Sequence, residues 1–170
     1  MRVHGFPPGA GCAPRLLILG SMPGRASLAA GQYYAQPRNQ FWRLMGDLVG
    51  AQPELPYRER VAALVAQGCA LWDVIASCER PGSLDASIVT DSVETNDFAD
   101  FHARHPTIEL IACNGATAER LYRRRVQPHL AGRAARIPLV RLPSSSPAHA
   151  GQTYAAKREA WARAFESVRN

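Results

Sequence analysis

The chain has 170 residues, of which 46% are hydrophobic and 20% charged, proportions typical of a folded globular protein. No apolar run approaches the roughly 18 residues that a membrane-spanning helix needs, and the first residues lack the apolar core of a signal peptide. The composition therefore argues against a membrane protein, and we expect a cytoplasmic one. The length predicts a single domain over residues 1–170, in which residues 1–14 form an irregular lead-in with few anchors.

The net charge of +6 is unevenly distributed along the chain. Residues 1–50 carry +4, residues 51–114 carry −6 and residues 115–170 carry +8. This asymmetry favours an anionic partner, such as a nucleic acid, that meets surfaces built from both ends of the chain. The alternative is an arginine-rich proteome, since 19 of the 20 basic residues are Arg.

Cysteine and histidine spacing indicates neither a disulfide framework nor a metal site. Cys12, Cys69, Cys78 and Cys113 are scattered, and we expect them to be small buried hydrophobic residues. His102 and His105 share the end of one predicted helix but lack the carboxylate spacing of a metal site, so we expect them on a solvated face.

The first predicted elements are a buried strand and an amphipathic helix. Leu16–Leu19 is an unbroken apolar run that ends at Gly20–Gly24, which is typical of a strand buried on both faces. An apolar stripe at helical spacing follows, formed by Phe41, Leu44, Met45 and Leu48. Between them, Ser21–Asn39 is rich in polar and aromatic residues and is predicted to be a loop.

The middle of the chain predicts a helix, a second strand and a long loop. Pro56 precedes a helical stripe formed by Tyr57, Val61, Leu64 and Val65, and Gly68 ends it. Cys69–Val74 is the second apolar strand. The polar stretch from Ile75 to Asp97 is predicted to be a surface loop with short turns.

The remaining elements continue the same alternation. Asn96 and Asp97 are predicted to cap a helix that ends before Pro106, and Ile108–Cys113 is the third strand. The chain then predicts a helix over Ala116–Arg125, a basic connector over 128–136, a fourth strand over Ile137–Leu142, a polar loop and a closing helix from Tyr154 to Val168. Pro138 places the fourth strand at a sheet edge.

Strands that alternate with helices predict an α/β fold, here a three-layer α/β/α sandwich with a central four-stranded parallel sheet. The loops after Leu19, Asp73, Cys113 and Leu142 should then open on the same edge of the sheet. Ligands bind at that edge in parallel sheets, so these loops are expected to line one crevice.

The loops lack the glycine-rich phosphate and dinucleotide motifs and the G-x-S-x-G hydrolase motif. Tyr33, Tyr34 and Phe41 offer surfaces on which a base could stack. Asn39 and Asn114 offer carboxamides, which both donate and accept hydrogen bonds.

The adjacent serines suit phosphate contacts, and each candidate also has a simpler explanation. Ser144, Ser145 and Ser146 lie between Pro143 and Pro147, where hydroxyls and backbone amides could contact phosphate oxygens. They could equally form a solvated loop. Asn39 could simply cap the following helix, Asn114 could form a strand-end turn, and the tyrosines could belong to the core.

Several of these segments, taken together, resemble the uracil-DNA glycosylase superfamily. The runs from Gly20 to Gly24 and from Gln32 to Trp42 resemble its first motif, most similarly in the hypoxanthine-DNA (deoxyinosine) glycosylase branch. The later runs that fit this branch, in the same order, are Leu71–Val74, Ser77–Asp85, Asn114–Gly115 and Leu142–Ala148.

The resemblance implies a monomeric, monofunctional enzyme without a cofactor that flips a deaminated base out of double- or single-stranded DNA and hydrolyses its N-glycosidic bond. Such an enzyme initiates base excision repair and works beside the nucleoid. Asn39 resembles the catalytic amide that orients the attacking water, and Asn114 the base-reading or auxiliary catalytic Asn. Met22 occupies the place where other branches carry a catalytic Asp or Asn.

The resemblance also assigns the remaining site residues. The base-binding residues it implies are Gly20, Ser21, Met22, Tyr33, Tyr34 and Phe41. Those it implies for DNA binding are Arg38, Ser144, Ser145, Ser146 and His149, which lie in or near the loops that hold the flipped nucleotide.

Two positions depart from the branch, and two other functions stay open. Gln36 stands where His is common and His149 where Asn is common, which affects the expected breadth of substrates. Lyase chemistry is not expected, because the only lysine is Lys157 on the closing helix. The alternatives are a non-catalytic nucleic-acid-binding domain with the same stacking crevice, and an α/β enzyme that processes nucleotides or sugars.

Overall fold

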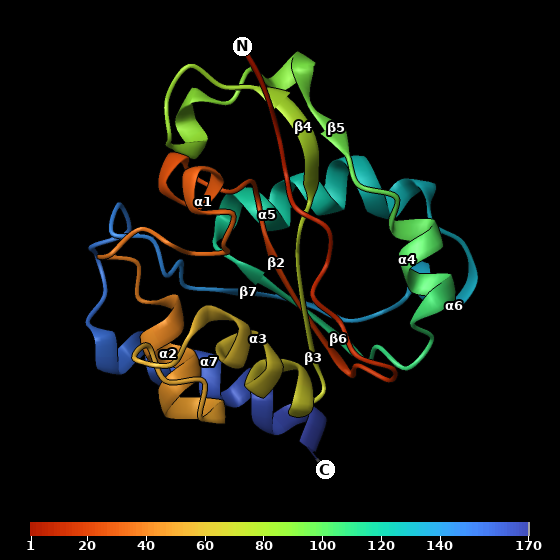
Figure 1. The fold of residues 1–170 in the computed structure, drawn as a ribbon. Helices are drawn as coiled ribbons and strands as arrows, with labels where there is room; N and C mark the ends of the chain where they lie inside the picture. Colours follow the sequence, from red (N-terminus) through yellow and green to blue (C-terminus); the bar gives the residue numbers. More distant parts are fainter. Residues whose placement is uncertain (170) are drawn as a thin grey trace.

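The computed structural model describes residues 1–169 and has a four-stranded parallel sheet at its centre (Figure 1). The strand order is β3 (Cys69–Asp73), β2 (Leu16–Gly20), β6 (Leu110–Asn114) and β7 (Leu139–Leu142). Leu16 of β2 pairs with Cys69 on one side and with Leu110 on the other, so β2 is central. The four strands predicted from apolar runs and their parallel arrangement are confirmed.

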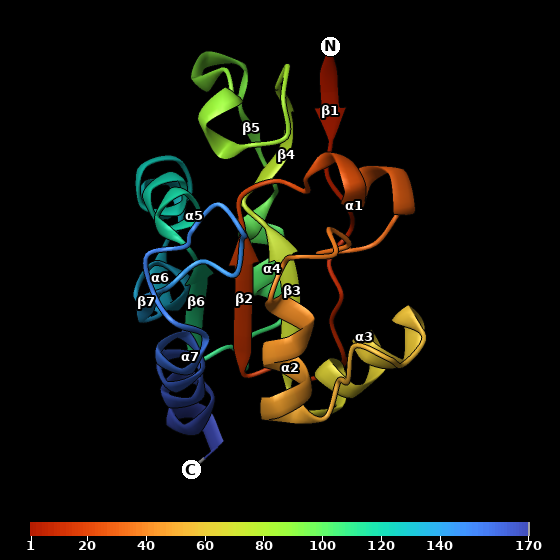
Figure 2. The same cartoon turned by 90° about the vertical axis from the view of Figure 1, so that its left-hand side faces the viewer.

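Helices cover both faces of this sheet (Figures 1 and 2). One face carries α2 (Phe41–Val49), α3 (Tyr57–Ala66) and α7 (Tyr154–Arg169), and the other carries α4 (Phe98–Arg104), α5 (Ala116–Leu121) and the short α6 (Gly132–Ala135). Side chains alternate along β2, so that Leu17 and Leu19 join the core beneath α4 and α5, whereas Leu16 and Ile18 join the core beneath α2 and α7. The three-layer α/β/α sandwich is therefore confirmed.

The predicted helix boundaries are largely observed. Helix α2 ends at Gly50, whose φ of +78° is the left-handed conformation that glycine adopts readily. Asp97 caps α4 as predicted, because its side chain accepts a hydrogen bond of 3.0 Å from the Asp100 N–H. The helix predicted over Ala116–Arg125 is α5 followed by a wider π-helical turn over Tyr122–Val126.

A second, antiparallel sheet was not expected from the sequence, and it corrects two predictions. Strand β1 (Arg2–His4) lies within the segment predicted to be an irregular lead-in, and it pairs with β4 (Ile75–Glu79). Strand β5 (Glu94–Thr95) pairs with β4 on its other side, so the segment predicted to be one long surface loop contains two strands. These strands are short and partly polar, and what stabilises them is pairing between distant parts of the chain.

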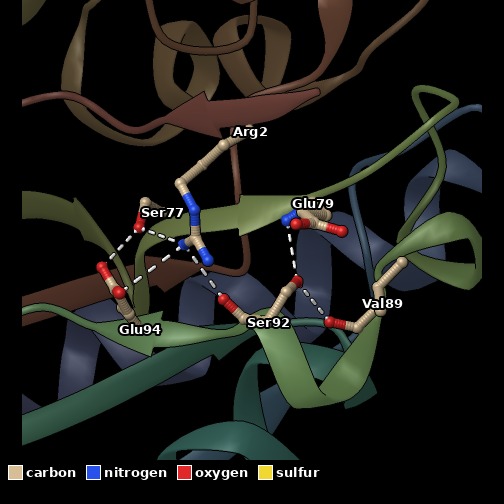
Figure 3. Close-up of polar contacts among 6 residues, drawn as sticks. All are labelled: Arg2, Ser77, Glu79, Val89, Ser92 and Glu94. Atoms are coloured by element: carbon tan, nitrogen blue, oxygen red, sulfur yellow. Dashed lines mark hydrogen bonds and ion pairs between the residues drawn. The ribbon is translucent and has the colours of Figure 1, made fainter.

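Polar contacts hold this second sheet together (Figure 3). The Arg2 guanidinium donates a hydrogen bond of 2.8 Å to the Ser77 hydroxyl and one of 3.1 Å to the Ser92 carbonyl. The same group lies 3.7 Å from Glu94 Oε1, which makes an ion pair. The sheet thereby supports the segment between β4 and β5, and part of that segment reaches the candidate site described below.

The loop after β2 is also more ordered than predicted, because it contains the short helix α1 (Arg25–Ala30). Two further turns of 3₁₀-helix occupy Asp85–Ser87 and Thr90–Ser92. In Figure 2, β2 points toward α1, and the loop after β7 passes beside the end of β2.

Two side-chain expectations are wrong. His102 is only 5% exposed rather than solvated, and its Nε2 lies 3.0 Å from the Tyr122 hydroxyl in the core beneath α4. Burial lowers the pKa of His102 to about 4, with the nearby Arg133 and His105 acting in the same direction. Cys12 is exposed, whereas the other three cysteines are buried as expected.

Candidate active site

A cleft of about 690 Å³ opens at the carboxyl ends of the parallel strands. It is lined by the loops that follow β2, β6 and β7, by Asp73 at the end of β3, and by residues 83–86 from the segment between β4 and β5. The predicted convergence on one crevice is therefore confirmed for the loops after β2, β6 and β7, whereas β3 contributes only Asp73, because β4 begins at Ile75 without an intervening loop. Of the candidate residues, Phe41 is the one that does not line this cleft.

Asn39 lies in the cleft wall immediately before α2. Its side-chain Oδ1 accepts a hydrogen bond of 2.9 Å from the Phe41 N–H, the first of α2, so it helps to cap the helix from the position before the N-cap residue Gln40. Its backbone N–H donates to the Gln36 carbonyl at 2.9 Å. These two contacts fix the orientation of the carboxamide at the cleft, so the capping role and a functional role are compatible.

Asn114 forms a two-point contact with a buried serine at the ends of β6 and β7. Its Nδ2 donates to Ser145 Oγ and its Oδ1 accepts from the Ser145 N–H, each at 2.9 Å. Ser145 is fully buried, and its carbonyl accepts a 2.9 Å hydrogen bond from the N–H of Gln40, just before α2. Ser145 therefore lies beneath the surface and joins three loops, whereas the neighbouring Ser144 and Ser146 are partly exposed.

The aromatic side chains form a layer along one wall. The rings of Tyr34 and Phe41 are stacked with their centroids 4.0 Å apart, and Phe41 is fully buried behind Tyr34. Tyr33 is packed edge-on against Phe6, and its hydroxyl donates to the Pro7 carbonyl at 2.9 Å. Tyr34 has a φ of +55°, an uncommon conformation for a tyrosine, which points to a constrained position at a functional site.

The loop after β2 and the rim complete the predicted set. Ser21 donates a hydrogen bond of 2.6 Å to Asp85 Oδ1, and Met22 is largely buried beside it. Arg38 and His149 are exposed on opposite loops at the cleft. Gly20 lies at the end of β2, deep in the cleft.

Two carboxylates in the cleft, Asp73 and Asp85, were not among the sequence candidates. Asp73 ends β3, in register with Gly20, and its backbone carbonyl accepts a hydrogen bond of 2.8 Å from Asn96. Its side chain is 3% exposed, and Oδ2 has no hydrogen-bond partner in the described part of the chain. The available sequence signal was an acidic residue at the end of an apolar strand.

The electrostatic surroundings of Asp73 favour its neutral form. Burial and, to a lesser extent, the negative charge of Asp85 raise the pKa of Asp73 to about 7, against the opposing positive charge of Arg80. The Arg80 guanidinium donates to the carbonyls of Pro23 and Gly82, at 2.6 Å and 3.0 Å, rather than to Asp73.

The cleft thus offers oriented amides, aromatic rings, hydroxyls and one buried carboxyl group whose pKa is raised to about 7. Within residues 1–169, no group of three His, Cys, Asp or Glu side chains is arranged to hold a metal ion. None of the described helices is long and apolar enough to cross a membrane. A planar heterocycle could stack on Tyr34 and meet amide and carboxyl groups at its edges.

The fold and the cleft define an α/β enzyme whose site, at the carboxyl edge of a parallel sheet, has the groups to accommodate a base. Residues 8–167 match the profile of the Uracil DNA glycosylase superfamily. The chain therefore belongs to this superfamily, and it is a DNA glycosylase.

Individual relatives agree with this assignment. The chain is 37% identical over 116 residues to the Hypoxanthine DNA glycosylase of Methanosarcina barkeri, an alignment that covers 68% of this chain and 72% of that relative. It is 36% identical, with the same coverage, to the Hypoxanthine DNA glycosylase of Methanosarcina acetivorans. The solution NMR structure of a Methanosarcina acetivorans protein, provisionally assigned as a uracil DNA glycosylase, superimposes with a TM-score of 0.78 at 29% identity over the full length of both chains.

Proposed function

We propose that this enzyme hydrolyses the N-glycosidic bond of deaminated bases in DNA, with hypoxanthine preferred and uracil also accepted, and so initiates base excision repair. The observation that carries the proposal is an oriented carboxamide, Asn39, that lines the same cleft as Asn114 and Tyr34. Two relatives named Hypoxanthine DNA glycosylase support the choice of base. In this proposal residues 1–170 act as one domain and as a monomer, in the cytoplasm beside the nucleoid.

The wall formed by Tyr34 is the proposed binding surface for the flipped base. Phe41 supports the Tyr34 ring from behind, so the base stacks on a surface that is already rigid. Extracting a base from the duplex costs a few kcal/mol and is cheapest where the base is mispaired, as a deaminated base is. Stacking on an aromatic ring returns about 1–3 kcal/mol of that cost.

Asn39 is the proposed positioning group for the attacking water. A carbonyl oxygen has two lone pairs, so Asn39 Oδ1 can accept from water while it caps Phe41. A neutral amide is not a strong base, and the reaction therefore depends on placing the water and on stabilising the charge that develops on the departing base. Met22 supplies no carboxylate in the loop after β2, so placing the attacking water is left to Asn39.

Contacts with the DNA backbone are proposed for the rim. Arg38, Ser144, Ser146 and His149 lie at the cleft and are at least partly exposed, which suits contacts with phosphate. The buried Ser145 contributes indirectly, because it holds the loop against Asn114. The basic ends of the chain add a favourable long-range field for DNA.

Strand cleavage by an amine nucleophile is disfavoured by the position of Lys157. Its side chain is 2% exposed, and Nζ donates a hydrogen bond of 2.6 Å to the His149 carbonyl. Burial also lowers the pKa of Lys157, but its amine is bound to the His149 carbonyl and Lys157 does not line the cleft. The proposed product is therefore an intact abasic strand.

The test is base release from duplexes that contain one deoxyinosine or one deoxyuridine. We expect strand scission only after heating in alkali, and loss of about 100-fold or more in rate for Asn39→Ala. Asp97→Ala is the matched control, because it removes the cap of α4 away from the cleft and should keep activity. Wild-type protein that binds DNA but releases neither base would favour the non-catalytic binding module instead.

A further inference from the structure

Two buried polar atoms without a well-formed hydrogen bond belong to side chains that line the cleft. Among the described residues, neither Tyr34 Oη nor Asp73 Oδ2 makes a hydrogen bond of good geometry, although the Asn114 side chain lies close enough to interact with the Tyr34 hydroxyl. Both side chains flank Gly20, where an added Cβ would lie 2.9 Å from Tyr34 Oη and closer still to Asp73 Oδ1. Glycine at this position therefore lets both side chains approach the end of β2 closely, at a cleft that all three residues line.

Native proteins rarely leave buried polar groups unsatisfied, so such a pair requires an explanation. The nearest cation does not provide one, because Arg80 is turned toward the carbonyls of Pro23 and Gly82. Asp73 is instead held in place through its backbone, by Asn96 and by the β2–β3 pairing. Its carboxyl group is thus fixed in position and available to a bound molecule.

We propose that Asp73, in its neutral form, is the proton donor to the departing base. This inference rests on the function proposed above, because it assigns a further catalytic residue to the same site. It places the unpartnered Asp73 oxygen against a polar edge of the flipped base, while the base stacks on the Tyr34 ring.

The step balances with water as the only co-reactant. The bond between C1′ of the sugar and the ring nitrogen breaks, and its electron pair moves to the base. The Asp73 carboxyl proton passes to the base as that negative charge develops. Water forms the new C1′–O bond, and the proton that it loses restores the Asp73 carboxyl group.

The other groups in the cleft are less suited to this role. Asn39 and Asn114 have amides, which do not give up a proton in water's pH range. Burial raises the pKa of Tyr34 far above its usual range, and the nearby Asp73 raises it further. Asp85 is exposed, and its Oδ1 already accepts a hydrogen bond from Ser21.

The charged and titratable groups that face Asp73 are Asp85, Arg80 and the phenols of Tyr33, Tyr34 and Tyr57. Phenols are uncharged near neutral pH, so Asp85 is the neighbour whose charge most favours the protonated form of Asp73. Paired carboxyl groups with different environments commonly divide acid and acceptor roles in this way.

The experiment is the pH dependence of single-turnover base release from a deoxyinosine duplex. The wild-type rate should fall about tenfold per pH unit once the pH exceeds about 7.5, because the donor is then ionised. Asp73→Asn should be roughly 100-fold slower near pH 6.5 and should lose this descending limb. Its DNA affinity should match that of the wild type measured alongside, and its thermal unfolding should remain cooperative.

Asp85→Asn is the matched control, since it removes the other carboxylate of the cleft. It should retain the descending limb but move it to lower pH, because Asp73 loses a neighbouring negative charge. A wild-type rate that is flat across this pH range, or an Asp73→Asn rate equal to the wild type, overturns the assignment. If Asp73→Asn does not fold, an unmoved limb in Asp85→Asn overturns it.

The failures of the two proposals are distinguishable. Wild-type protein that releases no base at any pH contradicts the glycosylase function itself. Wild-type protein that releases base, but without the expected limb, contradicts only the role of Asp73 and leaves the function of the site intact.

Discussion

Replacing Asp73 with Asn should change how the stability of the protein depends on pH. In the native protein burial raises the pKa of this carboxyl to about 7, compared with 3.8 for a free side chain. Between these values the folded state holds a proton that the unfolded state has lost. The contribution of Asp73 to stability is therefore fully present below about pH 4 and is lost as the pH rises through about 7.

The size of the effect follows from the pKa difference. About three pKa units correspond to about 4 kcal/mol, at 1.36 kcal/mol per unit. Asn has nearly the same shape and no charge, so Asp73→Asn avoids this loss. The stability of the variant relative to the wild type should rise by about 4 kcal/mol between pH 4 and pH 8, or about 10 °C in Tm for a chain of this length.

The assay is thermal unfolding, followed by circular dichroism, for both proteins at several pH values in one buffer series. The difference between the two Tm values is the informative quantity, because it cancels the other titrating groups, His102 among them. A Tm difference that stays constant from pH 5 to pH 8 would refute the reasoning. It would mean that water or Arg80 solvates the Asp73 carboxylate far better than its 3% exposure suggests.

Three further outcomes are expected. Asn114→Ala should lower the free energy of unfolding by about 1–3 kcal/mol and slow base release, because both of its hydrogen bonds to the buried Ser145 are lost; single-turnover kinetics and Tm check this, and an unchanged Tm would contradict it. His102→Gln should remove a loss of stability that the wild type suffers as the pH falls from about 6.5 toward 4, since the native state resists protonating the imidazole beside Tyr122; Tm at acidic and neutral pH tests it. Arg38→Ala should weaken DNA binding, and the plot of the logarithm of the association constant against the logarithm of the salt concentration should become less steep, by about one unit of slope. Titrations at several salt concentrations measure this, and an unchanged slope would exclude a phosphate contact.

Local sequence patterns were sufficient for the layered core. Leu16–Leu19 and Cys69–Trp72 are apolar at every position, a pattern typical of a strand covered on both faces. The amphipathic stripe beginning at Phe41 likewise required one buried face. Because parallel strands share one carboxyl edge, the position of the cleft followed from the same patterns.

Some features of the site were also identifiable from the sequence, and others were not. Asn39, Asn114 and the tyrosines were identifiable, because amides and aromatic rings are unusual in loops that merely connect strands. Burial was not identifiable, since a run of three serines does not reveal that Ser145 alone is fully covered. Phe41 was expected to bind the base, and it instead lies behind Tyr34, because the helical stripe also requires it in the core.

The sequence by itself determined the parallel sheet, its helical layers, the crevice and the amide groups in it, because each follows from local patterns of apolar, polar and amide residues. Only the tertiary structure decided what depends on distant segments meeting. It paired β1 with β4, and it buried His102 against Tyr122. It also set Asp73 beside Gly20, where desolvation changes the chemistry of an ordinary carboxylate. A pKa depends on three-dimensional surroundings, and no local pattern encodes them.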